Sequence, residues 1–268
     1  MLSQKQIDQY NEQGYVIPDF RLPDTLVKDM RHELKTLIAT NPQMASDAMF
    51  VPHLPQENPQ GLKSPNHKKW CSYACNHDIL NMVSDLIGKN IALWGTTVFG
   101  KPAGNGKETP WHQDSQYWPI RPLASCSTWI AIDDVDVENG CMRIIPGSHK
   151  GNTHLNHHIA ERDDLTLHQE LDADQFDEEQ AVDVILKRGQ MSFHDINIVH
   201  GSRRNTSAKR RAGFVLRFMP TTSHFDRDLG RKLELGSEAI NYSNRALLLV
   251  RGVDACGLNN YKIGHEAH

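Results

Sequence analysis

His112 and Asp114 stand two positions apart in the stretch Thr109-Pro-Trp-His-Gln-Asp-Ser, a spacing that suits a shared metal ion. In an extended chain, side chains two positions apart leave the same face of the backbone, so an imidazole nitrogen and a carboxylate oxygen can meet at one centre. A third ligand is needed, and His200, in His-Gly-Ser-Arg-Arg-Asn, is the best candidate downstream. Two histidines and one carboxylate, with the opposite positions open, are the ligands of non-haem Fe(II) oxygenases.

Other histidines offer competing interpretations. His194, in Phe193-His-Asp, competes with His200 as the third ligand, and we expect it to be a satisfied histidine beside the site. His112 and Asp114 taken alone could also be a hydrogen-bonded structural pair. A further group of histidines follows a turn in a polar stretch, which favours a solvated surface over a second metal cluster; its members are His149, His154, His157 and His158.

Composition bounds the class of protein. The 268 residues are 38% hydrophobic and 23% charged, which is typical of an ordinary globular chain, and the formal net charge is −4. That charge gives no bulk attraction to nucleic acid or to an anionic membrane surface. No apolar run approaches the roughly 20 residues that span a bilayer, and the amino terminus has no apolar signal core. We therefore expect a cytoplasmic protein with no nucleic-acid or membrane partner.

Two smaller features fit the same expectation. The five cysteines form no CxxC pair, which predicts free thiols in a reducing compartment. A basic run at 203–211 could bind nucleic acid, but it is short and the chain is acidic, so a solvated turn around one functional arginine is the better interpretation.

The first part of the chain, 1–89, predicts a helical layer. Ser3 and Gln6 form a capping-box pattern that opens a helix ending at Gly14, and a short extended piece follows, which Pro18 confines to a sheet edge. Apolar residues at helical spacing predict a helix from about Asp24 to Asn41, and a further helix covers 78–87. Between these helices, the proline-rich segment 42–70 predicts no regular structure and is a candidate lid.

From Asn90 the pattern changes to strands separated by turns. Asn139-Gly140 predicts a tight hairpin turn between two of them, and 151–180 is polar enough to be an insertion or a peripheral helix. Strands are expected at 91–100, 128–133, 141–146, 182–186, 191–194 and 213–219. A helical layer on many short strands favours a β-sandwich or barrel. We expect one domain over 1–268, with its core at 90–220 and a carboxyl-terminal extension at 221–268.

Several separated motifs resemble the phytanoyl-CoA dioxygenase family of Fe(II)- and 2-oxoglutarate-dependent oxygenases. The resemblance runs from Gly14-Tyr-Val to about Pro220. It rests on Lys101-Pro, Pro110-Trp-His-Gln-Asp-Ser, Trp129-Ile-Ala-Ile-Asp-Asp, Asn139-Gly-Cys-Met-Arg-Ile-Ile-Pro-Gly-Ser-His-Lys, and His200-Gly-Ser-x-x-Asn-x-Ser with Arg211 beyond. It implies a double-stranded β-helix, the jelly-roll or cupin-like fold, with α-helices layered on a mainly β core.

The resemblance also implies roles for individual residues. His112, Asp114 and His200 would bind Fe(II), with 2-oxoglutarate and O2 as co-substrates. Arg211 would hold the distal carboxylate of 2-oxoglutarate, since its planar fork pairs with a carboxylate through two charge-assisted hydrogen bonds. Ser202 would donate to the same carboxylate. Further positions that would contact the co-substrate are Lys101, Gln113 and Trp129. The carboxylate of Asp114 implies hydroxylation, because a small residue replaces it in the family's halogenating relatives.

The substrate is predicted only by class. In the implied fold, loops over the metal set specificity, so 42–70 and the turn after Asp114 are the candidates. Possible pocket residues are Tyr117, Trp118, Arg121, Asn197 and Arg217. Basic side chains near the iron suit a small anionic or zwitterionic metabolite. The stretch from Asn244 resembles bacterial family members that act on organophosphonates such as 2-aminoethylphosphonate. The alternatives are an acyl-CoA hydroxylase of the same family, with the run at 203–211 near the nucleotide phosphates, and a non-catalytic metal-binding jelly-roll protein.

Overall fold

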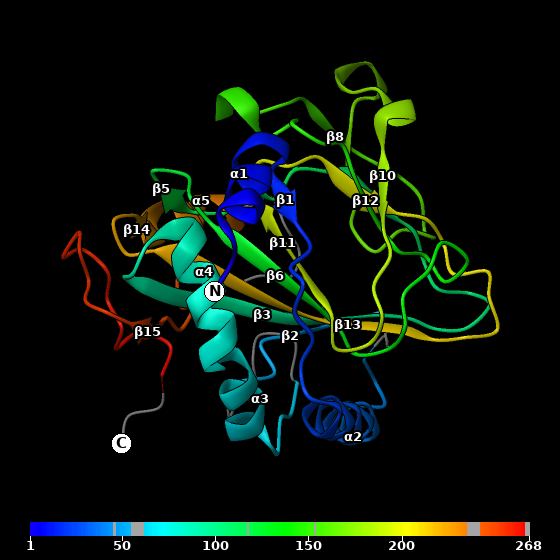
Figure 1. Cartoon of the computed structure of the whole chain (residues 1–268), viewed down its shortest axis with the longest axis horizontal. Helices are drawn as coiled ribbons and strands as arrows, with labels where there is room; N and C mark the ends of the chain where they lie inside the picture. Colours follow the sequence, from blue (N-terminus) through cyan, green and yellow to red (C-terminus); the bar gives the residue numbers. More distant parts are fainter. Residues whose placement is uncertain (45–46, 55–61, 117, 153, 235–241, 266–268) are drawn as a thin grey trace.

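A large antiparallel sheet forms the centre of the molecule, which is described here by a computed structural model (Figure 1). The structure describes residues 1–44, 47–54, 62–116, 118–152, 154–234 and 242–265. The sheet has the order β1-β11-β6-β13-β3-β15, and β2 also pairs with β3. Its strands are β1 (Tyr15–Val16), β2 (Ala48–Phe50), β3 (Ile91–Lys101), β6 (Cys126–Ala131), β11 (Met191–Asp195), β13 (Arg211–Pro220) and β15 (Leu248–Arg251).

A smaller antiparallel sheet lies against one face of the large sheet and carries the order β10-β7-β12-β4. Its strands are β4 (Thr109–His112), β7 (Met142–Ile144), β10 (Val182–Val184) and β12 (His200–Ser202). Side chains from both sheets, such as Val215 and Trp129 from one and Ile144 and Val184 from the other, share one buried apolar cluster. Two sheets packed on a common core form the jelly-roll sandwich that the sequence predicted.

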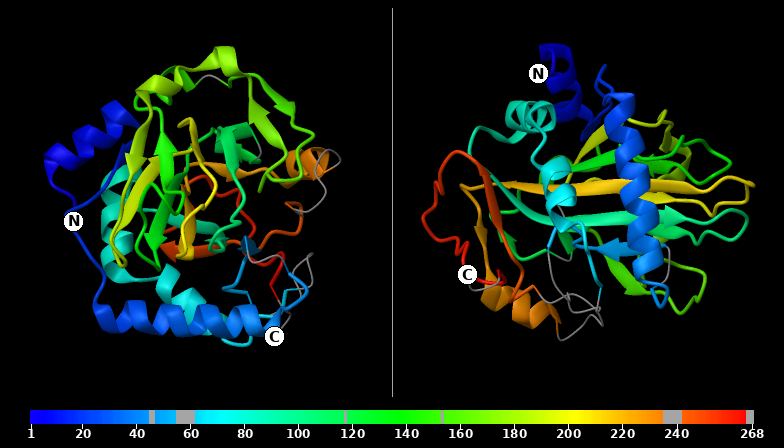
Figure 2. Two further views of the ribbon diagram at one scale, coloured as in Figure 1. Left: turned by 90° about the vertical axis from the view of Figure 1, so that its right-hand side faces the viewer. Right: turned by 90° about the horizontal axis from the view of Figure 1, so that it is seen from below.

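Helices cover the other face of the large sheet (Figures 1 and 2). These are α1 (Gln4–Gln13), α2 (Asp24–Thr40), α3 (His67–Ala74) and α4 (His77–Ile87). Met30 of α2, Trp70 of α3 and Val83 of α4 are fully buried in one cluster with Phe214 and Leu216 of the sheet. The predicted capping box is present, because Ser3 accepts from the Gln6 N–H while the Gln6 side chain accepts from the Ser3 N–H. The helices expected at 4–13, 24–41 and 78–87 correspond to α1, α2 and α4 and are confirmed.

Three expectations about local structure were wrong. The proline-rich segment contains β2 and the beginning of α3, so proline content there does not exclude regular structure; residues 55–61 of the candidate lid lie outside the described part. Asn139-Gly140 does not close a hairpin, because β6 before it and β7 after it belong to different sheets. Of the two alternatives for 151–180, the peripheral helix is wrong, because the segment holds the hairpin of β8 (His157–Ile159) and β9 (Gln169–Leu171).

The remaining elements complete the outline. A two-stranded sheet joins β5 (Ile120–Arg121) to β14 (His224–Phe225), and α5 (Arg227–Glu234) follows it. Short 3₁₀ turns are η1 (Asp114–Gln116), η2 (Lys150–Asn152), η3 (Ala173–Gln175) and η4 (Glu178–Gln180). Strand β15 pairs with β3, so the carboxyl-terminal segment is hydrogen-bonded into the large sheet. Among the described residues, no helix combines the length and the apolar character that crossing a bilayer requires.

Candidate metal centre and its cavity

Two neighbouring strands of the small sheet position the two histidines of the predicted metal site. His200 of β12 is the register partner of His112 of β4, and their ring centroids lie 4.2 Å apart. Asp114 opens η1 directly after β4. One ligand atom from each of the three residues lies within 4.8 Å of the others, and all three side chains are buried. The structure therefore brings together the three side chains that the sequence singled out.

Backbone carbonyls hold both imidazoles in the form that binds metal. His112 Nδ1 lies 2.8 Å from the Pro110 carbonyl oxygen, and His200 Nδ1 lies 3.0 Å from that of Ile198. A carbonyl can only accept, so each Nδ1 carries the proton and donates it. Each Nε2 is then left with its lone pair, which is the atom that a metal requires. Burial holds the pKa of His200 well below its usual value, which keeps this ring neutral.

The Asp114 carboxylate is favoured in its charged form. Burial alone raises the pKa of this carboxyl, but the neighbouring His112 and His200 rings and the positive charge of Arg217 outweigh burial and lower the pKa. His112 Nε2 and Asp114 Oδ1 are 3.7 Å apart. Two neutral imidazoles and one ionised carboxylate are the donor set of a divalent iron site, and ligation requires these protonation states. The residues present fit Fe(II).

His194 lies beside this site without joining it. Its ring centroid is 5.0 Å from that of His200, and it belongs to β11 of the large sheet. Burial lowers the pKa of His194 to about 4, so the ring is neutral, and its buried Nδ1 has no hydrogen-bond partner in the part of the chain that the structure describes. The structure groups His200, rather than His194, with His112 and Asp114.

Arg211 lies at the start of β13, on the same side of the large sheet as the metal site. Its Nε and Nη2 donate to the Gly140 carbonyl at 3.1 and 2.9 Å, and Nη2 also reaches the Ser202 hydroxyl at 3.4 Å. The guanidinium carbon is 5.4 Å from the centroid of the Trp129 ring. Only 4% of Arg211 is exposed, and burial lowers its pKa to about 10. No carboxylate of the described residues lies within 4.0 Å, so this buried cation is available to an anionic ligand.

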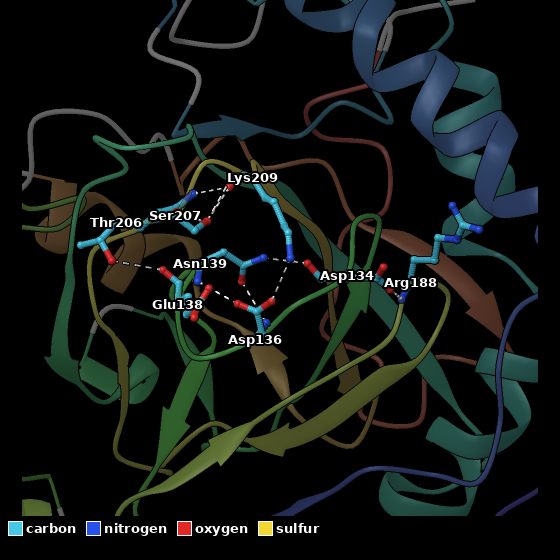
Figure 3. A network of polar contacts seen from close by, with 9 residues as sticks. Asp134, Asp136, Glu138, Asn139, Arg188, Thr206, Ser207 and Lys209 are labelled. Atoms are coloured by element: carbon cyan, nitrogen blue, oxygen red, sulfur yellow. Dashed lines mark hydrogen bonds and ion pairs between the residues drawn. The ribbon is translucent and has the colours of Figure 1, made fainter.

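The loop that presents the Gly140 carbonyl is held by Asn139 (Figure 3). The Asn139 side chain accepts from the Asp136 N–H at 2.9 Å and donates to the Asp134 carbonyl at 2.8 Å, while Asp136 accepts from the Asn139 N–H at 2.9 Å. Gly140 itself has φ +81°, and a Cβ there would meet the Arg203 carbonyl at 2.5 Å. Asn139 and Gly140 therefore form a loop that fixes Arg211, instead of the hairpin turn that their sequence suggested.

Lys101 is buried and is not among the residues that line the cavity beside His112, Asp114 and His200. Its ammonium donates to the carbonyls of Lys107, Ser202 and Arg203. Three carbonyls match the three donors of an ammonium group. The structure thus places the Lys101 ammonium at the strand end that carries Ser202, and its contact with the co-substrate stays a prediction.

Gln113 and Asn197 also lie behind the site. The Gln113 amide donates to the Asn197 carbonyl at 2.7 Å and accepts from the Leu155 N–H at 2.9 Å, and the Gln113 backbone N–H donates to His157 Nε2 at 3.1 Å. Both residues are fully buried and neither contributes to the cavity wall. Their position is that of residues which orient the two neighbouring ligands.

A cavity of about 730 Å³ opens beside the metal ligands. This volume lies within the usual range for small-molecule sites. His112, Asp114 and His200 line it together with Arg211, Ser202 and Trp129, and so do Trp118 and Arg217 from the predicted substrate residues. Arg121 is exposed and donates to the Trp118 and Ile120 carbonyls outside this cavity, and Tyr117 lies outside the described residues.

The hairpin β8–β9 supplies a wall of this cavity that sequence reasoning missed. Its contributions are Ile159, Ala160, Glu161, Thr166, Leu167, His168 and Gln169. The segment suggests a peripheral element because it is rich in polar residues, and its two strands form a separate two-stranded sheet. The apolar residues Ile159, Leu165, Leu167 and Leu171 within this polar stretch were the available signal. Tyr242, in the carboxyl-terminal segment, also lines the cavity without any motif to mark it.

A jelly-roll sandwich that holds two histidines on its small sheet, with a carboxylate directly after one of them, defines a class of protein. That ligand set with open positions belongs to non-haem Fe(II) oxygenases, and a buried arginine in the same cavity suits the co-substrate of the 2-oxoglutarate-dependent branch. The family model for phytanoyl-CoA dioxygenase (PhyH) matches residues 10–213. The chain therefore belongs to the phytanoyl-CoA dioxygenase family, whose members are 2-oxoglutarate-dependent iron dioxygenases, and the predicted family, fold class and cofactor set are confirmed.

Curated relatives include peroxisomal phytanoyl-CoA dioxygenases. The protein from Bos taurus is 29% identical over 157 residues, which cover 57% of this chain and 47% of the relative; that from Homo sapiens is 30% identical over 165 residues, covering 59% and 48%. The matched residues span about half the length of these relatives.

Solved structures share the fold. A non-heme monooxygenase, ThoJ, superposes with a TM-score of 0.71 at 23% identity over 95% of this chain and 86% of that one. EctD from S. alaskensis, solved with 2-oxoglutarate and 5-hydroxyectoine, gives a TM-score of 0.67 at 18% identity, covering 84% and 78%. At these identities the likeness concerns the fold.

Proposed function

We propose that this chain is an Fe(II)- and 2-oxoglutarate-dependent hydroxylase of a small anionic or zwitterionic metabolite. The observation that carries the proposal is one shared cavity. It contains the three metal ligands and the buried Arg211 guanidinium, which has no carboxylate partner among the described residues. A non-catalytic binding protein on the same scaffold would show no turnover that depends on Fe(II) and 2-oxoglutarate, so the test below separates the two.

The division of work among the residues follows from their positions. When bound, iron, 2-oxoglutarate and O2 supply the oxidation, in which the keto acid becomes succinate and CO2 while one oxygen atom enters a substrate C–H bond. His112, Asp114 and His200 would hold the metal. Arg211 and Ser202 would bind the far carboxylate of the keto acid, because the guanidinium and the hydroxyl both face the cavity and both donate.

Apolar side chains would protect the reaction from water. The Trp129 ring lies beside the Arg211 guanidinium, and the cavity wall also includes Met142 and Val215. Exclusion of water strengthens the charge-assisted contacts to the co-substrate. The same wall leaves the substrate's reacting carbon in apolar surroundings, with polar contacts restricted to a few positions.

Charge inside the cavity supports an anionic substrate. Arg217 lines the cavity from β13, six residues beyond Arg211, which leaves a second arginine in addition to the one assigned to 2-oxoglutarate. An acyl-CoA substrate would need free basic groups outside the cavity for its nucleotide phosphates. In the basic run, Arg203 pairs with Glu178, Arg204 with Asp164, Lys209 with Asp136 and Arg210 with Asp133. These pairings weaken the case for an acyl-CoA.

The test is substrate-stimulated release of succinate. Purified full-length protein with Fe(II), 2-oxoglutarate and O2 should release succinate faster when one compound of a metabolite panel is added, and organophosphonates and amino acids belong in that panel. The compound should gain one oxygen atom, detected by mass spectrometry. Asp114→Ala should abolish both readouts. Full activity in Asp114→Ala would contradict the proposal. So would a wild-type protein that neither binds 2-oxoglutarate nor shows metal-dependent turnover with any compound of the panel.

A further inference from the structure

His194 differs from the other buried histidines of the described residues in having no hydrogen bond. In His112 and His200, Nδ1 meets a backbone carbonyl, and in His53 it meets the Thr96 hydroxyl. His194 is 2% exposed and its Nδ1 is enclosed, and neither ring nitrogen has a hydrogen-bond partner within the described part of the chain. The ring therefore lies beside the metal ligands as expected, but it is not the satisfied histidine that the sequence suggested.

An unpaired polar side chain in the interior needs an explanation. Most buried polar atoms in folded proteins have a hydrogen-bond partner, and a bound water, an ion or a ligand often completes the exceptions. An apolar ring in the same place would avoid the free-energy cost of unpaired nitrogens. His194 lies in the wall of the cavity that also contains His112, Asp114 and His200. Its missing partner can therefore come from a molecule bound in that cavity.

Nε2 is the nitrogen of His194 that a bound molecule can reach. Nδ1 is enclosed by protein, which leaves Nε2 as the nitrogen for the cavity. Burial lowers the pKa of His194 to about 4, so the ring is neutral and carries one N–H. Buried N–H groups go unpaired less often than buried acceptors do, which favours the proton on Nε2 and the lone pair on the enclosed Nδ1. The cavity wall then holds a neutral N–H donor.

The register of the large sheet places this donor relative to Arg217. His194 of β11 lies opposite Ser127 of β6, and Ser127 lies opposite Arg217 of β13. Residues directly opposite each other in an antiparallel ladder project from the same face of the sheet, and both His194 and Arg217 line the cavity. Their backbones are two strand spacings apart, which is about 10 Å. One molecule can therefore contact the cation with an anionic group and the neutral donor with a second, different group.

We propose that His194 is a specificity-determining residue, which donates a hydrogen bond from Nε2 to a neutral oxygen of the substrate, a hydroxyl or a carbonyl. The inference rests on the proposed function, since it concerns the substrate of the same site. A neutral donor suits a neutral acceptor, because this ring adds no positive charge to balance a buried carboxylate, whereas Arg217 offers one elsewhere in the wall. The substrate class is therefore an acid that carries a hydroxyl or keto oxygen apart from its acidic group.

The neighbours of His194 indicate what this contact would control. Its ring centroid is 5.0 Å from that of His200, so a substrate oxygen bound at Nε2 would lie near the metal ligands. Such an oxygen limits which carbon of the substrate can approach the metal. A site that hydrogen-bonds a substrate group also rejects an analogue without that group more strongly than an apolar pocket rejects a change of size. His194 would thus govern both the choice of compound and the carbon that is oxidised.

Binding of matched acids tests the contact with probes of known structure. The full chain is loaded under argon with Fe(II) and saturating 2-oxoglutarate, so that Arg211 is not available to the probes, and is titrated by calorimetry. The probe sets are butanoate, hexanoate and 3-phenylpropanoate, each with derivatives that carry one hydroxyl or one keto oxygen at successive carbons from C3. In at least one set, an oxygenated acid should bind wild type at least about fivefold more tightly than its parent. The hydroxyl and keto derivatives distinguish the two kinds of oxygen.

Three variants separate a ligand contact from a structural role. In His194→Phe, the preference for the oxygenated acid should vanish, while the parent acid binds within about twofold of wild type. His194→Gln keeps an N–H donor and should retain part of the preference. Ser192→Ala is the matched control, because Ser192 lies two positions earlier on β11 and is buried with a hydroxyl that has no partner among the described residues, but does not line the cavity. It should keep the wild-type preference.

Three results would overturn the inference. A wild type with no oxygen-dependent gain in affinity in any probe set, whether or not the parent acids bind, excludes the contact. A gain that persists in folded His194→Phe assigns the contact to another residue, and loss of the gain in Ser192→Ala makes the effect structural. Failure of the proposed function would look different: wild type would give no charge-transfer band with Fe(II) and 2-oxoglutarate, while the gain and its dependence on His194 would persist.

Discussion

His200 lies directly opposite His112 across the ladder that joins β12 to β4, and the two rings are 4.2 Å apart at their centroids. The strands come from distant parts of the chain, so one antiparallel pairing brings two of the three metal ligands together. Asp114 follows His112 by two positions, because β4 ends at His112 and η1 begins at Asp114. A slip of one residue in this register would turn one histidine away from the cavity, because alternate side chains leave opposite faces of a strand.

Removal of the carboxylate ligand should separate metal binding from folding. Asp114→Ala should lower Fe(II) affinity and substrate-stimulated succinate release by at least about 100-fold, since it removes one of three protein ligands. Metal content measured after gel filtration and the Fe(II)–2-oxoglutarate charge-transfer band report the loss. Thermal unfolding of the metal-free variant should remain close to that of metal-free wild type. Retention of both metal and activity would remove Asp114 from the ligand set.

Arg211→Lys should raise the KM for 2-oxoglutarate by about 10- to 100-fold while metal binding stays unchanged. Lysine keeps a positive charge but cannot form the two parallel hydrogen bonds with a carboxylate, and its ammonium cannot reproduce the paired contacts with the Gly140 carbonyl. Steady-state kinetics with varied 2-oxoglutarate measures the change. An unaltered KM in this variant would place the co-substrate elsewhere.

Substitution by alanine should destabilise the protein at Gly213 and have little effect at Gly95, two glycines of the large sheet. A Cβ at Gly213 would lie 2.1 Å from a carbon of the Trp129 ring, whereas a Cβ at Gly95 would lie 3.9 Å from Arg217, an ordinary contact. Gly213→Ala should therefore lower the free energy of unfolding by about 1–3 kcal/mol and weaken 2-oxoglutarate binding, because Trp129 must leave its place beside Arg211.

Gly95→Ala is the control and should change the free energy of unfolding by less than about 1 kcal/mol. Urea titration and the charge-transfer band measure the two quantities in each variant. Equal effects at the two positions would show that close packing of Trp129 on the strand does not govern the co-substrate end of the cavity.

His53 should make the fold sensitive to acid. It is 3% exposed, and among the described residues its one hydrogen bond joins Nδ1 to the Thr96 hydroxyl at 2.8 Å. Burial lowers the pKa of His53 to about 3. The unfolded chain, with a histidine pKa near 6.5, binds a proton first as the pH falls. Stability is then complete above about pH 6.5 and is lost as the pH falls toward 3, by up to roughly 1.4 kcal/mol per pH unit.

His53→Gln removes this titration. Between pH 6.5 and pH 4, wild type should lose roughly 2–3 kcal/mol more in the free energy of unfolding than the variant does, measured by urea titration at each pH. Substitution of His77, which is exposed, should leave the wild-type pH dependence in place. Parallel curves for wild type and His53→Gln would mean that His53 is protonated equally in both states.

Local patterns in the sequence were sufficient to predict structural features that depend on neighbouring residues. The capping box at Ser3, the terminating Gly14 and the proline that keeps β1 at the sheet edge all depend on residues within a few positions. The grouping of His112, Asp114 and His200 and the presence of Arg211 in the cavity wall could also be predicted, because few residue types suit the chemistry; their roles in binding iron and 2-oxoglutarate stay predictions. The sequence also suggested Arg217 and Trp118, which line the cavity.

Features that depend on distant partners were not accessible from local patterns. Asn139-Gly140 has the composition of a hairpin turn, yet the strands on its two sides pair with β11 and β13 in one sheet and with β10 and β12 in the other. Trp70 lies in a proline-rich stretch, and its burial against Phe214 favours a helix that local composition argued against. Lys101 and Gln113 are close to the site in sequence, but backbone carbonyls from other segments decide where their side chains point.

The contacts of Gln113 have a consequence for anyone who redesigns this protein. The residue between two metal ligands accepts from the Leu155 N–H, and its own N–H donates to His157, at the start of the hairpin that forms the outer wall of the cavity. Exchanging this hairpin with that of a relative to obtain a new selectivity would also change the hydrogen bonds that orient the ligands. Libraries that vary 159–169 while preserving 155–157 should retain iron far more often than whole-segment chimaeras.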